Sequence, residues 1–364
     1  MQTKRIAFFV TALDSGGLEN YLLRFLGFAK ENIQATVYCK AGYIGNLEED
    51  YLEVGAKIIP FKLGMFTILD YYKLFKEFKL QNYDAVVDFT GNFAAFPLAT
   101  AMKAGVKKRI AFYRGSTNHF KEDFWRLKYN NYLNFLIPKV ATSVLANSKA
   151  ALNFFFENIW EKDEQYGIVY NGIDQFSFLT TKKDLRKELN IPLNAFVVGH
   201  VGRYNIAKNH STLIKVAFEL CKNNSNIYFI FCGNKTIENL SDEVKKENLD
   251  LQIKLLGFRK DIINVLNTLD CFYFPSITEG QPNALIEAMM VGLPFVASDI
   301  EPIRETVSTK YSSQLINPFD WSLAVKKILD LEQNNTVFDT KLLSETAIRK
   351  YNANQQFNKF LKYL

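Results

Sequence analysis

Two glutamates frame a short segment whose chemistry suits a polar ligand. Residues 278–289 read TEGQPNALIEAM, with Glu279 near the start and Glu287 eight residues later. An apolar, strand-like run precedes this segment, and an apolar run that favours a helix follows. Pro282 suits the first turn of a helix, and Gly280 lets the backbone approach a ligand closely. A strand, a turn and a helix start in this order place free N–H groups and a positive dipole end at one point, which favours phosphate or sugar oxygens.

The two carboxylates admit two interpretations. Because a carboxylate accepts hydrogen bonds, each glutamate suits sugar hydroxyls rather than phosphate. Alternatively, Glu279 caps the helix and Glu287 is a solvated helix residue, since capping by such side chains is common. Taken alone, the two residues leave both interpretations open.

A pair of cations follows another strand-like run, Phe196–Val201. Gly202 and Arg203 come directly after the run, and Lys208 precedes a helix-like segment. Two cations beside one helix start suit a diphosphate, whose negative charge needs neutralising as it leaves. The alternative is that both are solvated loop residues.

The first strand-like run, Ile6–Val10, leads to Gly16 and Gly17 and then to a helix-like segment. Two glycines at this place let the backbone approach a ligand, although an ordinary turn between strand and helix would look the same. The GxGxxG motif is missing, which argues against a simple NAD-binding site.

With these motifs in this order, the chain resembles retaining GT-B glycosyltransferases of family 4, the glycosyl transferases group 1. The resemblance implies that Glu287 binds the ribose hydroxyls of a nucleotide, and that Glu279 with the following loop amides holds the donor sugar. Arg203 and Lys208 match the diphosphate clamp of the family. The implied catalytic residues are Arg203, Lys208 and Glu279, and the implied donor-binding residues are Glu287, Gly280, Gln281, Pro282, Asn283, Gly202 and Phe258.

On the N-terminal side, the resemblance places Gly16 and Gly17 in the cleft, near the donor phosphate and the acceptor. Asn171, in an Asn-Gly-Ile-Asp segment, lines the same cleft. The family often has a histidine after its fifth strand, where this chain has Arg114, and His119 lies five residues later. Which of the two takes the place of that histidine stays open.

The implied reaction moves a sugar from a nucleotide-sugar to an acceptor hydroxyl with retention at the anomeric carbon. The leaving diphosphate takes the acceptor proton, so no general base is assigned. UDP is the expected nucleotide by analogy alone. No cofactor and no metal is expected, because no Asp-x-Asp motif stands in a metal-binding position and two cations are present. The alternatives are an enzyme acting on a soluble acceptor and a non-catalytic, two-lobed protein that binds nucleotide-sugars.

Basic and aromatic residues alternate through Lys103–Lys139, and Tyr71–Lys79 has the same character on a smaller scale. Such a surface fits anionic lipid headgroups or a lipid diphosphate. We therefore expect a lipid-linked glycan acceptor in bacterial-type cell-surface polysaccharide assembly, with peripheral membrane contact through this stretch. The alternative is that the aromatic rings are core and the lysines are solvated.

The elements that position these residues alternate between strand-like and helix-like runs, which indicates parallel sheets wound on both faces. The chain has 364 residues, enough for two domains. We expect an acceptor-binding Rossmann-like domain at 1–178 and a nucleotide-sugar-binding one at 190–345. A linker at 175–192 would join them, and a helix at 346–364 would cross back to the first domain. Together these form the GT-B fold that the resemblance implies.

Charge and targeting signals narrow the setting. The net charge of +6 is mild and spread over both halves, so nucleic acid is not expected as a partner. No signal peptide and no apolar stretch of membrane-spanning length is recognised. The expected location is the cytoplasm, either free or at the inner face of the membrane.

Overall fold

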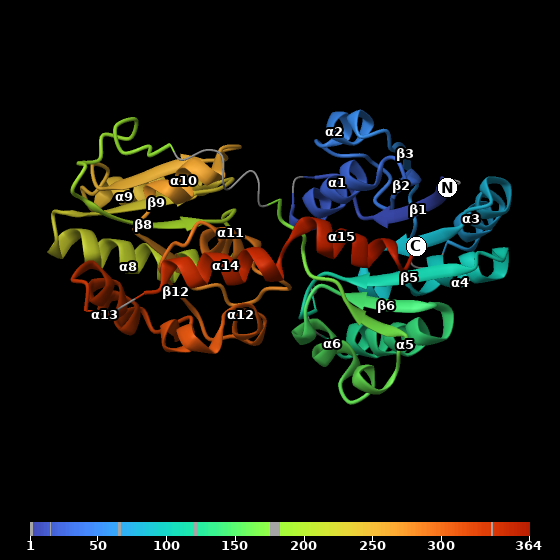
Figure 1. Ribbon diagram of the computed structural model, residues 1–364. Coiled ribbons are helices and arrows are strands. Elements are labelled where there is room, and N and C mark those ends of the chain that lie inside the picture. Colours follow the sequence, from blue (N-terminus) through green and yellow to red (C-terminus); the bar gives the residue numbers. More distant parts are fainter. Residues whose placement is uncertain (1–2, 15, 65–66, 119–122, 175–182, 336–337) are drawn as a thin grey trace. The chain divides into compact units, whose positions relative to one another are not determined.

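The computed structural model describes residues 3–14, 16–64, 67–118, 123–174, 183–335 and 338–364. It divides into two compact units (Figure 1). Unit 1 comprises Met1–Gly172 and Ala353–Leu364, and unit 2 comprises Ile173–Asn352. Each unit contains one all-parallel sheet with helices on both faces, so the expected α/β class with two Rossmann-like sheets is confirmed. Within the described residues, no helix is long and apolar enough to span a bilayer.

Unit 1 has a seven-stranded sheet in the order β3-β2-β1-β4-β5-β6-β7. Its strands are β1 (Lys4–Val10), β2 (Ile33–Cys39), β3 (Lys57–Pro60), β4 (Ala85–Asp88), β5 (Lys108–Tyr113), β6 (Ser143–Ala146) and β7 (Tyr166–Ile168). Its α-helices are α1 (Gly17–Ala29), α2 (Glu48–Glu53), α3 (Ile68–Gln81), α4 (Ala95–Ala104), α5 (Phe124–Val140), α6 (Lys149–Phe156) and α15 (Ala353–Leu361). Short 3₁₀ helices are η1 (Gly91–Ala94) and η2 (Trp160–Lys162).

Two hydrophobic clusters fill unit 1, one on each face of the sheet. Helices α1, α2 and α15 contribute to the first, in which Phe25 of α1 packs on Phe360 of α15 with ring centroids 4.6 Å apart. Helices α3 to α6 contribute to the second, for example through Phe78 of α3 and Ile137 of α5. Because consecutive strand residues point to opposite faces, Phe8 lies in the first cluster and Phe9 in the second.

Unit 2 has a six-stranded sheet in the order β10-β9-β8-β11-β12-β13. Its strands are β8 (Phe196–Val201), β9 (Ile227–Cys232), β10 (Ile253–Gly257), β11 (Cys271–Phe274), β12 (Phe295–Ser298) and β13 (Leu315–Ile316). Its helices are α8 (His210–Asn223), α9 (Thr236–Lys246), α10 (Ile262–Thr268), α11 (Asn283–Met290), α12 (Glu301–Thr306), α13 (Trp321–Glu332) and α14 (Thr340–Lys350), with the 3₁₀ helices η3 (Ile206–Lys208) and η4 (Thr309–Gln314).

The boundaries between the units differ from the expected ones. The expected linker at 175–192 is too long, because residues 183–192 pack into unit 2. Leu185 is fully buried and its N–H donates to Thr268 at 2.8 Å. Arg186 donates to Asp270 at 2.7 Å. The first unit therefore ends at Gly172 rather than at residue 178.

The expected C-terminal helix at 346–364 is two helices, and they belong to different units. Helix α14 packs on α11 in unit 2, whereas α15 joins the core of unit 1 (Figure 1). Phe357 and Phe360 are buried in that core. Tyr351, between the two helices, is buried in unit 2.

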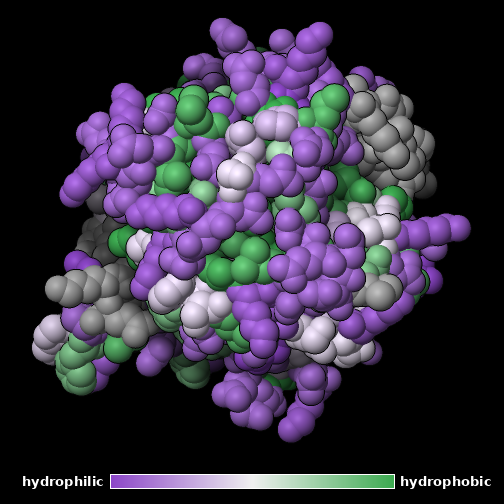
Figure 2. Space-filling view, turned by 90° about the vertical axis from the view of Figure 1, so that its left-hand side faces the viewer, coloured by the Kyte–Doolittle hydropathy of each residue, from purple (hydrophilic) through white to green (hydrophobic). Residues whose placement is uncertain are grey.

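On the face that Figure 2 shows, hydrophilic side chains predominate, and smaller groups of hydrophobic side chains lie between them. All four cysteines are buried and unpaired. They act as small apolar core residues.

Candidate functional site

The two motifs that the sequence singles out in the second half meet at one point of the unit 2 sheet. In the strand order, β8 lies between β9 and β11, so the connections from β8 and β11 leave to opposite sides. Ligands of open parallel sheets bind in the crevice at such a switch point, beyond the carboxyl ends of the strands. Gly202, Arg203 and Lys208 follow β8, and Glu279 follows β11.

The loop after β8 depends on Gly202, because any larger residue there would displace neighbouring side chains. A Cβ on Gly202 would lie 2.7 Å from Nε2 of His200 and 3.4 Å from the Lys208 side chain. Asn205 then caps η3, accepting from the N–H of Lys208 at 3.0 Å. Asn209 donates to the carbonyl groups of Pro275 and Pro318, which fastens this loop to the end of β11.

The loop after β11 places the two glutamates as the sequence predicted. Glu279 lies in the loop, and Glu287 lies in the second turn of α11. The helix begins one residue later than expected, at Asn283, so Pro282 is its N-cap. Pro282, as the N-cap residue, makes no side-chain hydrogen bond to the start of α11.

Lys208 and Glu279 form an ion pair across the switch point. The distance from Nζ to Oε1 is 2.6 Å, and the side chains are 18% and 10% exposed. Lys208 Nζ also lies 4.8 Å from the centre of the Phe274 ring, and the N–H of Ile277 donates to Ala207 at 2.8 Å, joining the two loops. A cation and an anion side by side at this edge of the sheet can bind a diphosphate and a sugar hydroxyl respectively.

Two histidines that the sequence did not single out lie behind Lys208. The rings of His200 and His210 are 5.4 Å apart, and Nδ1 of His200 lies 3.1 Å from the carbonyl oxygen of Tyr273. Burial lowers the pKa of His210 to about 4, and burial together with His210 and Lys208 holds the pKa of His200 well below its usual value. Both rings are therefore neutral near pH 7 and do not compete with Lys208 for an anion.

The other predicted donor residues surround this pair or lie along the same edge. Arg203 is exposed and makes no ion pair with any residue that the structure describes. Gln281 is buried, while Gly280 and Asn283 are half-buried. Phe258 follows β10 and is 62% exposed, so its ring is available at the carboxyl edge of the sheet.

In unit 1 the switch point lies between β1 and β4. Gly16 is the N-cap of α1 and Gly17 its first residue. A Cβ on Gly16 would lie 2.5 Å from a carboxylate oxygen of Glu19, so this glycine leaves room for Glu19 to fold back over the helix start. The positive end of α1 is thus already faced by one carboxylate, which the sequence did not predict.

Arg114 follows β5 and lies against the core of unit 1. Its guanidinium stacks over the ring of Tyr21 at 3.9 Å, and Nε and Nη1 have no hydrogen-bond partner in the described part of the chain. Burial lowers the pKa of Arg114 to about 10. The alternative candidate, His119, lies outside the described residues. Asn171 is buried next to Gly172, whose backbone packs on Ala353 and Phe357.

A second lysine–carboxylate pair, missed by the sequence analysis, lies at the switch point of unit 1. Nζ of Lys40 is 3.0 Å from Asp88 at the end of β4, and Asp88 is fully buried. The same ammonium donates to the Thr90 hydroxyl at 2.7 Å and to the Phe93 carbonyl at 3.0 Å. All three of its protons therefore have acceptors within the protein.

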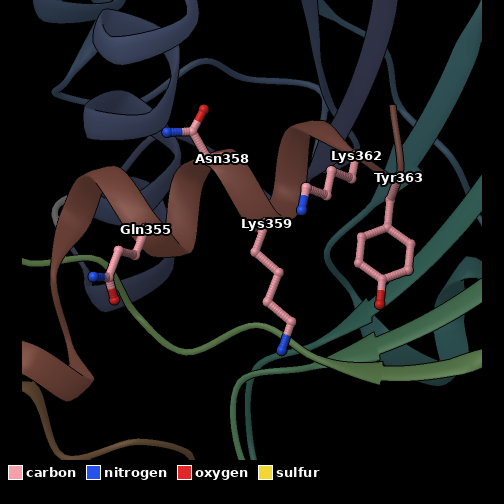
Figure 3. Close-up of a pocket in the computed structure, with 5 residues that line it drawn as sticks. All are labelled: Gln355, Asn358, Lys359, Lys362 and Tyr363. Atoms are coloured by element: carbon pink, nitrogen blue, oxygen red, sulfur yellow. The ribbon is translucent and has the colours of Figure 1, made fainter.

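A separate cavity of about 600 Å³ lies along α15 in unit 1. It is lined by Gln355, Asn358, Lys359, Lys362 and Tyr363 (Figure 3). Gln355, Lys359 and Tyr363 extend from the same side of the helix. None of the predicted site residues lines this cavity. Across the described residues, no cluster of three or more histidine, cysteine or carboxylate side chains could hold a metal ion.

Comparison with known proteins agrees with the fold and with the class of enzyme. Residues 181–354 match the family model described as glycosyl transferases group 1. The capsular polysaccharide biosynthesis glycosyltransferase CapH of Staphylococcus aureus is 25% identical over 352 residues, which cover 92% of this chain and 94% of that protein. The UDP-Gal:alpha-D-GlcNAc-diphosphoundecaprenol alpha-1,3-galactosyltransferase of Escherichia coli is 26% identical over 260 residues, covering 69% and 66%.

Among solved structures, Anabaena Alr3699/HepE in complex with UDP-glucose matches with a TM-score of 0.81 and 20% identity, covering 99% of this chain and all of that one. This similarity establishes the GT-B fold. Together, the matches indicate that the chain is a glycosyltransferase, an enzyme of the hexosyltransferase type.

Proposed function

We propose that the protein transfers a sugar from a UDP-sugar to a hydroxyl group of a lipid-diphosphate-linked sugar, with retention, during cell-surface polysaccharide assembly. The observation that carries the proposal is the Lys208–Glu279 pair at the switch point of unit 2, inside the segment that matches the family model. The UDP-glucose complex of the structural relative supports the donor. The diphosphoundecaprenol substrate in the name of the E. coli relative supports the acceptor class.

The resting ion pair suggests how the donor site works. An arriving diphosphate carries about two negative charges and competes with Glu279 for the ammonium of Lys208. Once Lys208 turns to the diphosphate, Glu279 is released to accept from a hydroxyl of the donor sugar. Arg203, exposed beside the same loop, adds the second cation. Donor binding thus exchanges one ion pair for another rather than leaving a half-buried charge unpaired.

In the chemical step the bond between the anomeric carbon and the diphosphate oxygen breaks, and the diphosphate leaves with the electron pair. The acceptor oxygen forms the new bond on the same face and its proton passes to the departing diphosphate. Lys208 and Arg203 stabilise the charge that develops on the leaving group. These two cations stabilise the leaving diphosphate in place of a metal ion, so we assign the reaction no metal and no cofactor.

The remaining roles follow from position. Glu287 of α11 accepts from the ribose hydroxyls, the backbone at 280–283 holds the sugar, and Phe258 lies near the base. In unit 1, we assign the acceptor to the edge that carries Gly16, Gly17 and Arg114. Unpartnered N–H groups on Arg114 suit an anionic group of the acceptor. With a lipid-linked acceptor, we expect the enzyme at the inner face of the membrane.

Nucleotide binding and sugar transfer test different parts of the proposal. UDP, GDP, ADP and their sugars are screened by thermal shift on the wild type, on Glu287→Ala and on the control Glu305→Ala, a glutamate of α12 outside the assigned site. A ligand at a hundred times its Kd stabilises by about 2.7 kcal/mol, a shift of a few degrees. We expect the shift with UDP compounds, its loss in Glu287→Ala and its retention in Glu305→Ala.

Transfer is then measured with a short-chain lipid diphosphate sugar and with a free sugar. Product from the lipid-linked acceptor alone supports the acceptor class, and product from the free sugar alone points to the soluble-acceptor alternative. Nucleotide-sugar binding without transfer to any acceptor in a broad panel would favour a binding protein. The anomeric configuration of the product, read by NMR, decides whether the transfer retains or inverts.

A further inference from the structure

We propose that the outward faces of α3 and α5 in unit 1 form one surface that docks on an anionic lipid bilayer. Docking would bring the enzyme to a lipid-linked acceptor, which deepens the proposed function. The inference rests on the proposed function only for this purpose of the surface. Its evidence is the placement of exposed apolar and basic side chains on two helices of one face of the sheet.

Helix α5 is apolar on two opposite faces. Leu133 and Ile137 are buried in the core of unit 1. On the outward side, at 3.6 residues per turn, a stripe spans an arc of roughly 100°. It consists of Phe124, Trp125, Lys128, Tyr132, Phe135 and Lys139. The four rings are between 52% and 75% exposed. A helix with a second apolar face, exposed on the outward side, is typical of a surface that binds a partner or a membrane.

The basic residues of α5 are interleaved with its rings. Nζ of Lys128 lies 4.5 Å from the centre of the Phe124 ring, and Nζ of Lys139 lies 3.5 Å from that of Phe135. No carboxylate occurs among the 17 residues of the helix. The outward stripe therefore combines large apolar area with positive charge that nothing on the helix neutralises.

Helix α3 repeats this arrangement. Ile68 and Leu69 are 84% and 74% exposed, and Lys76 lies 4.6 Å from the centre of the exposed Tyr72 ring. Its carboxylates lie off this stripe, and that of Glu77 accepts from the buried Tyr38 hydroxyl instead.

The two helices belong to one surface. Helix α4 contacts both, and it is built largely of small residues. Tyr71 of α3 packs on Phe96 of α4 with ring centroids 5.9 Å apart. Both helices begin at the carboxyl edge of the sheet, because each follows a parallel strand. The most exposed apolar residues of both, Ile68 and Trp125, are at these starts, on the edge assigned to the acceptor.

This surface is smaller than the basic stretch Lys103–Lys139 that the sequence indicated. Arg109 belongs to the interior instead, since its guanidinium donates to the carbonyl groups of Val140 and Val106 at 2.7 and 2.6 Å. Phe112 and Tyr113 are core residues of β5. The alternative that the rings are core therefore holds for β5, and the surface interpretation holds for α5.

Charge decides between the possible occupants. Two copies of the same surface would bring Lys128 and Lys139 of one copy against a surface of like charge on the other, in a partly desolvated interface. An anionic bilayer accepts both components, because aromatic rings enter the boundary between headgroups and acyl chains while ammonium groups meet the phosphates. The geometry therefore favours a lipid surface.

Flotation with vesicles tests the proposal on the full-length protein, without any sugar substrate. The vesicles are phosphatidylcholine with 30% phosphatidylglycerol, or phosphatidylcholine alone. We expect binding to the anionic vesicles at low salt, and a loss of about tenfold or more in Phe124→Ser/Trp125→Ser. The matched control is Leu251→Ser/Phe319→Ser in unit 2, whose side chains are 75% and 59% exposed and which should bind like the wild type.

The charge component has its own pair of variants. Lys128→Gln/Lys139→Gln should weaken binding about fivefold per lysine and reduce its dependence on salt. The control, Lys245→Gln/Lys246→Gln at the end of α9, removes the same charge elsewhere and should leave binding unchanged. Circular dichroism and thermal unfolding of every variant establish that each is folded.

Three results would overturn the proposal: no binding of the wild type to anionic vesicles at low salt, equal binding by the ring variant and the wild type, or a wild-type dimer that the ring substitutions dissociate. The outcome is separable from that of the proposed function. A ring variant that no longer floats yet transfers normally to a short-chain acceptor supports both ideas. Vesicle binding by a wild type that transfers no sugar would leave the docking surface standing while the proposed function fails.

Discussion

Each unit of this protein has a lysine–carboxylate pair at the switch point of its sheet, and the two pairs differ in how the ammonium group is satisfied. Lys40 in unit 1 donates to Asp88, Thr90 and the Phe93 carbonyl, which uses all its protons. Lys208 in unit 2 donates to Glu279, and otherwise faces the Phe274 ring. A saturated lysine holds a loop in place, whereas a lysine with protons to spare can turn to a ligand.

The largest effect on stability is expected from Lys40→Met. This substitution leaves Asp88 fully buried beside no cation, which costs about 3–5 kcal/mol of unfolding free energy. Thermal or urea unfolding measures it. The control is Lys73→Met, which breaks an exposed pair with Asp70 and should change stability by about 0.5 kcal/mol or less. Equal losses in both variants would contradict the distinction drawn between saturated and exposed pairs.

Lys208→Met should act mainly on turnover. Loss of a donor that stabilises the departing diphosphate lowers kcat by about 10²–10³, or about 3–4 kcal/mol of transition-state stabilisation. Steady-state transfer and UDP affinity are measured together, with Lys215→Met of α8 as a matched control outside the assigned site. If Lys208→Met loses as much stability as Lys40→Met and keeps its turnover, then both pairs are structural and the comparison fails.

Glu279→Gln tests the carboxylate partner of Lys208 in the unit 2 pair. The amide keeps the shape of the side chain and removes the charge that holds Lys208 in the resting state. We expect UDP to bind at least as tightly, since the diphosphate no longer competes for the lysine, while transfer falls because a weaker acceptor orients the sugar. Calorimetry gives the affinity. A weaker affinity for UDP itself would mean that Glu279 assists diphosphate binding rather than opposing it.

The smallest effect concerns the histidines behind Lys208. His210 has a pKa of about 4 in the folded chain against about 6.5 when unfolded, so the unfolded state binds the proton first. Its contribution to stability is complete above pH 6.5 and is lost as the pH falls towards 4, by up to about 1.4 kcal/mol per pH unit. Unfolding of His210→Asn from pH 7.5 to 5 should be less steep in pH than that of the wild type. If the free energy of unfolding depends on pH equally in the wild type and in His210→Asn, then the pKa of His210 is not lowered by folding.

Much of the fold was predictable because strand and helix patterns are local. The boundaries predicted for β8, Phe196–Val201, are those of the structure, and the run predicted at Ile6–Val10 lies within β1. The short edge strands β7 and β13 were missed, since three and two residues carry too little pattern to recognise. The division between units also needed the structure, because residues 183–192 are mostly polar and charged, yet Leu185 and Ile191 among them are buried in unit 2.

The roles assigned to the site residues stay predictions, and the contacts between these residues were not predictable from the sequence. Lys208 and Glu279 are 71 positions apart, and nothing local reveals that they pair. Lys40 was overlooked because a lone lysine after a strand has no motif, and its importance comes from the burial of Asp88. His200 and His210 lie ten residues apart on a strand and a helix, and only the fold brings them together behind Lys208.

The placement of α15 also determines the order in which the polypeptide can complete its parts. Unit 2 is a continuous segment, Ile173–Asn352, inserted between two pieces of unit 1. During synthesis, Phe357 and Phe360 leave the ribosome only after all of unit 2, so the core of unit 1 stays open on one face until then. A released chain that ends at residue 352 should thus contain a protease-resistant unit 2 beside a susceptible unit 1, and restoring residues 353–364 should close the core of unit 1.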